Sequence, residues 1–197
     1  NKGIIGTFSK DEYLENKDDF IFILPKLWLA KQGKVRIRLE PKQGFSIYGL
    51  KAMSYCGHLI AGLFKGWLPG MIFLLPHLKI KFGSRILYSC SELNPLTTLY
   101  NGLIAKILGL KLVLFTWQNI PPETRLRGFK LKLSNALVRL NLKLADGIIC
   151  GNRKAAKIVE KFKIQNSKFK ILVCPLSGVD IEKFRPGIRS NWREQLN

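Results

Sequence analysis

Small or polar side chains follow four apolar runs in the second half of the chain, where strands would end. They are Ser91 and Glu92, Gln118 and Asn119, Gly151 and Asn152, and Ser177 and Gly178 with Asp180 just beyond. Carboxylate and amide oxygens accept hydrogen bonds and amide N–H groups donate them, so such side chains can bind a polar ligand. No C-x-x-C pair or cysteine–histidine cluster accompanies them, which argues against a zinc site.

Alternating strands and helices must position these residues. The strands expected are 85–90, 111–116, 147–150 and 170–174, and the helices between them are 94–109, 128–145 and 152–163. This alternation predicts an α/β fold with a Rossmann-like, mostly parallel sheet and helices on both faces. Ligands bind such sheets outside the carboxyl ends of the strands, so we expect the polar residues to line one edge.

Local patterns support two of these helices. In 94–109, Leu99, Leu103 and Ile107 share one face, and Gly109 is a stop residue. In 152–163, Asn152 is a candidate cap for the first turn.

The first half of the chain is less regular. Strands are plausible in "GIIGTF", "DFIFIL" and "KVRIRL", and the apolar segment 56–76 resembles two short helices broken at "WLPG". These helices either belong to the core, which we favour, or lie on a bilayer with Phe64, Trp67 and Phe73 inserted.

The net charge of +20 points to a phosphate-bearing partner, and no acid occurs between Glu40 and Glu92. Nucleic acid, anionic lipid and a phosphorylated substrate all carry that group. The basic segments lack the aromatic and glycine pattern of an RNA-recognition motif and no helix-turn-helix stands out, which argues against nucleic acid. The absence of G-x-G-x-x-G and P-loop patterns disfavours a dinucleotide dehydrogenase or an NTPase.

Four motifs, in order and at consistent spacing, give the chain a family resemblance. They are "SELNP" at 91–95, "FTWQNIP" at 115–121, "ADGIICGNRKAA" at 145–156 and "ILVCPLSGVDIEKFRP" at 171–186. Together they resemble the amino-terminal domain of the family-4 retaining glycosyltransferases, enzymes with two Rossmann-like domains in the GT-B architecture. The resemblance covers about residues 85–197, and the glycine-rich loop that normally opens the domain has no clear match.

The resemblance implies a domain boundary and a reaction. Residues 1–187 would form the amino-terminal, acceptor-side domain, and 188–197 would begin the linker to a second domain that holds most of the nucleotide-sugar contacts. The reaction implied is transfer of a sugar, of hexosyltransferase type, from a nucleotide-sugar donor to a glycan or lipid-linked acceptor. The anomeric configuration is retained, the nucleotide sugar is a co-substrate, and neither a metal nor a further cofactor is expected. The 197 residues alone are expected to be inactive.

The resemblance also assigns roles to the polar residues. Gln118 stands where many relatives carry a histidine, and because glutamine is no base near neutral pH, we expect it to position the substrate. Asn119 and Asn152 would read acceptor hydroxyl groups. Glu92 is either an acceptor-side carboxylate or a cap for the helix that begins near Pro95.

The last motif has two readings. Gly178 and Asp180 would form the turn at the cleft, although a plain turn glycine and a helix cap would give the same residues.

The location expected for such an enzyme is the cytoplasm. Charge and apolar content also suggest peripheral binding to the anionic inner face of the membrane. The alternative from another class is a basic module without catalysis that binds a membrane surface or nucleic acid.

Overall fold

The computed structural model describes residues 20–30, 33–36, 46–53, 63–162 and 169–174. The elements in these ranges are β1 Ile21–Pro25, β2 Leu27–Ala30, β3 Gly33–Arg36, β4 Ser46–Leu50, α2 Met71–Phe82, β5 Ile86–Ser89, α3 Leu96–Ile107, β6 Lys111–Thr116, α4 Pro122–Arg125, α5 Gly128–Leu144, β7 Gly147–Cys150, α6 Arg153–Lys161 and β8 Lys170–Val173. The boundary expected at residue 187 lies outside these ranges.

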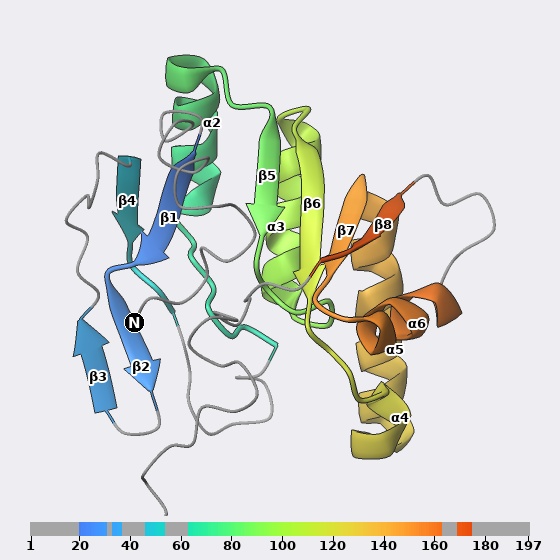
Figure 1. Cartoon of the computed structure of the whole chain (residues 1–197). Helices are drawn as coiled ribbons and strands as arrows, with labels where there is room; N and C mark the ends of the chain where they lie inside the picture. The colour runs from blue at the N-terminus through green and yellow to red at the C-terminus, as the bar shows by residue number, and fades with distance from the viewer. Residues whose placement is uncertain (1–19, 31–32, 37–45, 54–62, 163–168, 175–197) are drawn as a thin grey trace, which may run out of the picture.

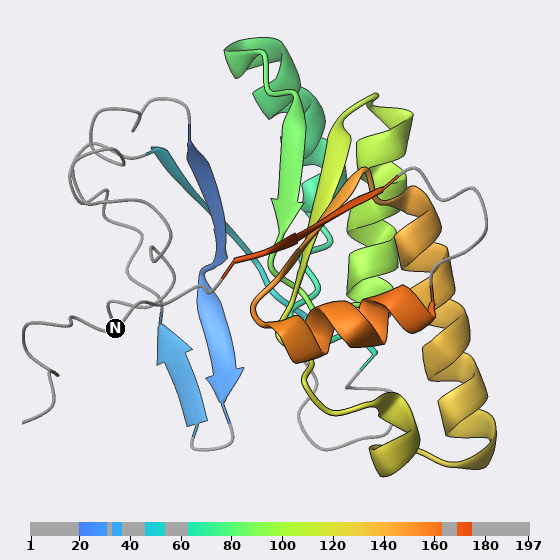
Figure 2. The same cartoon turned by 45° about the vertical axis from the view of Figure 1, so that its right-hand side comes forward.

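The central element is a four-stranded parallel sheet in the order β5-β6-β7-β8 (Figure 1). Its strands coincide with those expected from the apolar runs. Figures 1 and 2 show α3 and α5 side by side along the sheet and α6 beside β7 and β8. The prediction of a Rossmann-like α/β fold with a parallel sheet flanked by helices is confirmed.

One face of the sheet carries most of the core. Leu112, Leu114 and Ile148 are at most 1% exposed, and they occupy matching positions on neighbouring strands. On the other face, Tyr88 and Leu172 are 40% and 58% exposed. The helices therefore cover one face of the sheet more completely than the other.

The amino-terminal part forms two small sheets. β1 pairs with β4 in parallel, and β2 pairs with β3 as an antiparallel hairpin between them in sequence. β1 and β3 were expected from their apolar and β-branched residues, whereas β2 and β4 were not. The strand expected in "GIIGTF" lies outside the described residues.

The helix expected after "WLPG" is confirmed, because α2 begins at Met71 directly after Gly70 and continues through Pro76. Most of the helix expected before that break lies outside the described residues, and its described part, residues 63–66, forms a turn instead. Of the residues considered for insertion into a bilayer, Phe64 and Trp67 are half-buried and Phe73 is 81% exposed. Trp67 packs edge-on against Tyr100 with ring centroids 5.8 Å apart, so this side chain contacts α3.

The face of α3 that packs against the sheet carries mostly small side chains. Thr97, Thr98 and Ala105 are at most 1% exposed, whereas Leu103 and Ile107 on the opposite side are 47% and 83% exposed. The apolar face noted in the sequence therefore points outward.

Asp146 stabilises the amino-terminal edge of the sheet through hydrogen bonds. Its carboxylate accepts hydrogen bonds from Lys106 Nζ at 2.7 Å and from the backbone N–H of Leu112 at 2.8 Å, and Lys111 Nζ lies 3.4 Å away. Burial alone would raise the pKa of this carboxyl, but the hydrogen bonds from Lys106 and Leu112 outweigh burial, and the pKa is lowered. The "AD" of the third motif thus has a structural role here.

Replacing Asp146 with asparagine is expected to lower the free energy of unfolding near neutral pH by about 1–2 kcal/mol, because charge-assisted hydrogen bonds are lost from a partly exposed site. A carboxyl whose pKa is lowered by folding stabilises the native state above its unfolded pKa, and loses that contribution as pH falls through the folded pKa. The gap in melting temperature between wild type and variant should therefore shrink below pH 3.8, the ordinary value. Thermal unfolding of both proteins across this pH range measures the gap in melting temperature. A gap that stays constant would contradict the stabilising role of the Asp146 carboxylate.

Candidate functional site

The carboxyl ends of the four parallel strands meet at the lower edge of the sheet in Figure 1. The ladder continues past the strand ends, because Gly151 N donates to Thr116 O and Cys174 N donates to Cys150 O, both at 2.9 Å. The residues that follow β5, β6 and β7 are held at this edge by the sheet itself.

Glu92, after β5, is tied to the end of β6. Thr116 Oγ1 donates a hydrogen bond of 3.0 Å to Glu92 Oε2, and the same Oγ1 accepts one of 3.1 Å from the backbone N–H of Gln118. One hydroxyl group thus connects two of the predicted site residues. The second carboxylate oxygen, Glu92 Oε1, has no hydrogen bond to a described residue, and the side chain is exposed.

The alternative reading of Glu92 as a helix cap is wrong. The cap position of α3 is Pro95, and no side chain caps the helix there. The backbone oxygen of Glu92 instead accepts a 2.6 Å hydrogen bond from Thr98 Oγ1 in the first turn of α3. The carboxylate is left facing the edge.

The loop that carries Glu92 is anchored from α5. Asn141 is fully buried, and its Nδ2 donates to Leu93 O at 2.8 Å and to Pro95 O at 3.4 Å. Buried carbonyl groups need such donors, because an unpaired one costs free energy. Asn141 therefore fixes the backbone on both sides of the turn after β5.

Gln118 is half-buried, and its Nε2 donates to Ile120 O at 3.3 Å. Its Oε1 and its second amide hydrogen make no hydrogen bond to a described residue, so both are available to a ligand. Asn119, the next residue, is exposed and makes no hydrogen bond to a described side chain. The two amides are adjacent at the edge, as expected.

The β7 end packs against the residue that precedes Gln118. Gly151 is buried beneath Trp117, and a Cβ built on Gly151 would lie 2.1 Å from Trp117 Cε3. A side chain at this position would collide with the indole, so glycine lets the partly exposed Trp117 ring lie against the end of β7. Asn152 caps α6 as expected, since its Oδ1 accepts from Ala155 N at 2.8 Å. Its Nδ2 is then the group left for a ligand.

Gly178 and Asp180 lie outside the described residues. The others are brought to one edge, together with residues that the sequence analysis missed: Thr116, Asn141 and Trp117. The sequence contains an indication of Asn141, because it is a polar side chain that shares the apolar face of the expected helix with Leu137, Val138 and Leu142, as Ser134 also does.

The titratable groups near the edge do not form a metal site in the described part of the chain. Cys150 at the end of β7 is fully buried, and burial, with a smaller effect from Glu160, raises the pKa of its thiol to about 11. Cys150 is therefore a packing residue. Cys90, which follows β5, is exposed.

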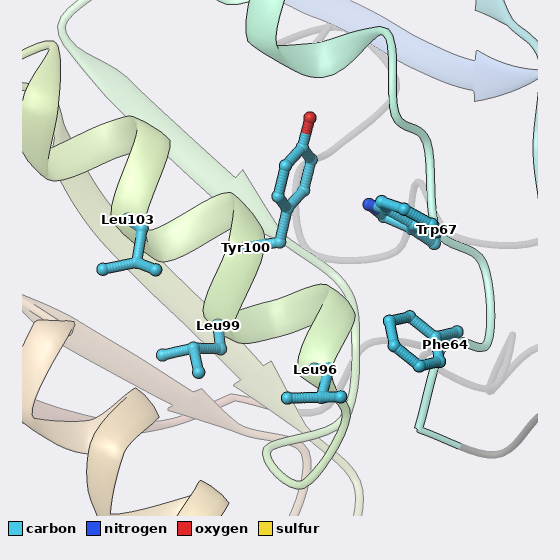
Figure 3. Close-up of a pocket in the computed structure, with 6 residues that line it drawn as sticks. All are labelled: Phe64, Trp67, Leu96, Leu99, Tyr100 and Leu103. Carbon is cyan, nitrogen blue, oxygen red and sulfur yellow. The ribbon is translucent and has the colours of Figure 1, made fainter. Parts of the chain in front are cut away.

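An apolar pocket lies away from this edge, between α3 and the turn before α2. It has a volume of about 230 Å³ and is lined by Phe64, Trp67, Leu96, Leu99, Tyr100 and Leu103. Figure 3 shows the three leucines in a row along α3, with Tyr100 of the same helix next to Trp67. Trp67 Nε1 is buried there without a hydrogen-bond partner among the described residues. The lining of this pocket is almost entirely apolar, in contrast to the polar side chains at the edge of the sheet.

Comparisons with known proteins return no relative. No family model, no curated protein and no solved structure matches the chain.

Proposed function

We propose that this chain forms the acceptor-side domain of a retaining glycosyltransferase, which transfers a sugar from a nucleotide-sugar donor to a glycan or lipid-linked acceptor. Two independent lines support the proposal. The four motifs resemble that family, and four polar residues that they supply lie at the carboxyl edge of a parallel sheet, where ligands bind in such folds: Glu92, Gln118, Asn119 and Asn152.

The connection from Glu92 through Thr116 to Gln118 carries the proposal. Glu92 Oε1 can accept a hydrogen bond from a sugar hydroxyl, and the side chain of Gln118, whose backbone Thr116 joins to Glu92, offers both a donor and an acceptor. Both side chains are already held by other hydrogen bonds, so little conformational freedom is lost when a substrate binds. The edge is thus suited to orienting a hydroxyl nucleophile.

The reaction implied needs a second surface to bind the donor and exclude water. The nucleotide sugar enters as co-substrate, and the departing nucleoside diphosphate is stabilised by positive charge and helix amino termini. In the family, most of those contacts come from the domain that follows this one.

A membrane location is also part of the proposal. No helix in the described ranges is long and apolar enough to cross a bilayer. Lipid-linked acceptors lie at a membrane surface, and basic residues favour binding to its anionic lipids. Peripheral binding at the inner face would bring the edge to such acceptors.

Replacing Gln118 with alanine is expected to lower turnover about 10-fold or more in the protein that carries this chain, because misplacing a reacting hydroxyl by about 1 Å can cost up to about 100-fold. The melting temperature should change little, since Gln118 is only half-buried. Release of nucleoside diphosphate that depends on an added acceptor, measured over a panel of nucleotide sugars, is the assay.

Thr124→Ala is the matched control, because Thr124 is exposed on α4 six residues further along the chain. It should leave both turnover and melting temperature unchanged. A Gln118→Ala protein that loses stability and activity in equal measure would contradict a positioning role, and no acceptor-dependent release with any donor would contradict the function.

A further inference from the structure

The outer side of the layer formed by α3 and α5 is apolar and exposed. On α3, Leu103 and Ile107 are 47% and 83% exposed, and Leu99 is half-buried beside them. On α5, Phe129 and Leu140 are 77% and 45% exposed. Scattered apolar residues are normal on a protein surface, but a group of them on adjoining helices marks an interaction surface.

The two helices form one continuous surface. A Cβ built on Gly102 of α3 would lie 3.0 Å from Leu144 of α5, so the helices are closely packed where they meet. Figures 1 and 2 both show them side by side. Leu99 and Leu103 also line the apolar pocket of Figure 3, so the surface continues inward towards Trp67. We call the set Leu99, Leu103, Ile107 and Leu140 the α3–α5 face; Phe129 is exposed further along α5, in its first turn.

All charge on these helices is positive. The sequences of α3 and α5 contain no aspartate or glutamate, and neither does that of neighbouring α2. Lys132, Arg139 and Lys143 are exposed on α5. Lys106 of α3 is paired with Asp146, so the positive charge available to an external partner comes from the basic residues of α5.

We propose that the α3–α5 face is the surface by which this protein docks on an anionic lipid bilayer. Apolar side chains enter the boundary between headgroups and acyl chains, and Lys132, Arg139 and Lys143 contact lipid phosphates. A second copy of the chain fits this face less well. A symmetric pair would place these three basic residues against their own copies without any acid on α3 or α5 to offset them.

The inference gives the membrane part of the proposed function a specific surface, and it rests on that part alone. Sedimentation with vesicles of neutral phosphatidylcholine, or of phosphatidylcholine with phosphatidylglycerol, measures docking without any sugar transfer. A failure of docking is therefore distinct from a failure of the glycosyltransferase assignment.

The wild-type protein should sediment with the anionic vesicles at least about 10-fold more than with neutral ones at low salt, and binding should weaken steeply as salt is raised. Arg139→Gln with Lys143→Gln should lower anionic binding about 5-fold or more. Leu103→Gln with Ile107→Gln should lower it similarly by removing insertion. Ile107→Gln alone, at a nearly fully exposed position, keeps the test usable if the double variant folds poorly.

Two controls match these changes elsewhere on the surface. Arg153→Gln with Lys154→Gln removes two exposed charges from α6, and Leu172→Gln removes an exposed leucine from β8. Both should bind like the wild type. Equal losses in the controls, or no preference for anionic vesicles, would overturn the proposal. So would a dimer that Leu103→Gln with Ile107→Gln abolishes while vesicle binding is unchanged.

Discussion

Replacing Glu92 with glutamine is expected to lower the rate of sugar transfer about 100-fold in the protein that carries this chain. The amide keeps the size of the side chain and can still accept from Thr116, but it loses the negative charge that orients an acceptor hydroxyl group. Losing one such electrostatic contact at a reacting centre typically costs about 100- to 1,000-fold. Steady-state turnover and the KM for the acceptor are the quantities to measure.

Glu123→Gln is the matched control, because Glu123 is an exposed carboxylate in the first turn of α4. It should leave turnover unchanged, and both variants should unfold at the wild-type temperature. If Glu92→Gln is as active as Glu123→Gln, Glu92 is a structural residue that only ties β5 to β6.

The second large effect is expected for Asn141→Ala. It should lower the free energy of unfolding by about 2–4 kcal/mol, because the buried carbonyl groups of Leu93 and Pro95 lose their donor and a cavity is left behind. The turn that carries Glu92 is then no longer anchored, so turnover should also fall in the fraction that stays folded. Chemical denaturation gives the first quantity, and an assay well below the melting temperature gives the second.

Asn101→Ala serves as the comparison. Asn101 is a half-buried asparagine on α3 whose side chain makes no hydrogen bond to a described residue. The Oδ1 of Asn141 also has no such partner, but its Nδ2 makes two hydrogen bonds, so the loss of Asn101 should cost less, under about 1 kcal/mol. Similar costs for the two variants would mean that the Asn141 hydrogen bonds contribute little to the turn after β5.

The strands of the central sheet could be predicted because their sequences are unambiguous. Short apolar runs such as 111–116, separated by helix-length segments, leave parallel strands with crossover helices as the simple solution. The cap at Asn152 and the stop at Gly109, which adopts a φ of +66°, were predictable for the same local reasons. Glu92, Gln118 and Asn119 follow from these strand ends.

The orientation of α3 could not be predicted in this way. Periodicity shows that Leu99, Leu103 and Ile107 share a face, but not whether that face meets the sheet. Gly102 and Ala105 decide the matter, because their small size lets the helix approach Leu112 closely, and that contact exists only in three dimensions. β4 was missed for a related reason, since its partner β1 is separated from it by a hairpin.

The residues that hold the site in place could not be predicted from the sequence either. Thr116 joins Glu92 to Gln118 across 24 positions, and Asn141 reaches back 48 positions to Leu93. No sequence motif indicates which residue either of them contacts. Their roles depend on the register of β5 with β6 and on the packing of α5 against α3.

The anomeric configuration of the transferred sugar tests the central claim most directly. The protein that carries this chain is incubated with its nucleotide-sugar donor and acceptor, and the product is followed by proton NMR from the first turnover. The account predicts a new glycosidic bond with the same anomeric configuration as the donor, formed by the wild type and strongly reduced in Glu92→Gln. A product of inverted configuration, or free sugar released without transfer, would contradict it.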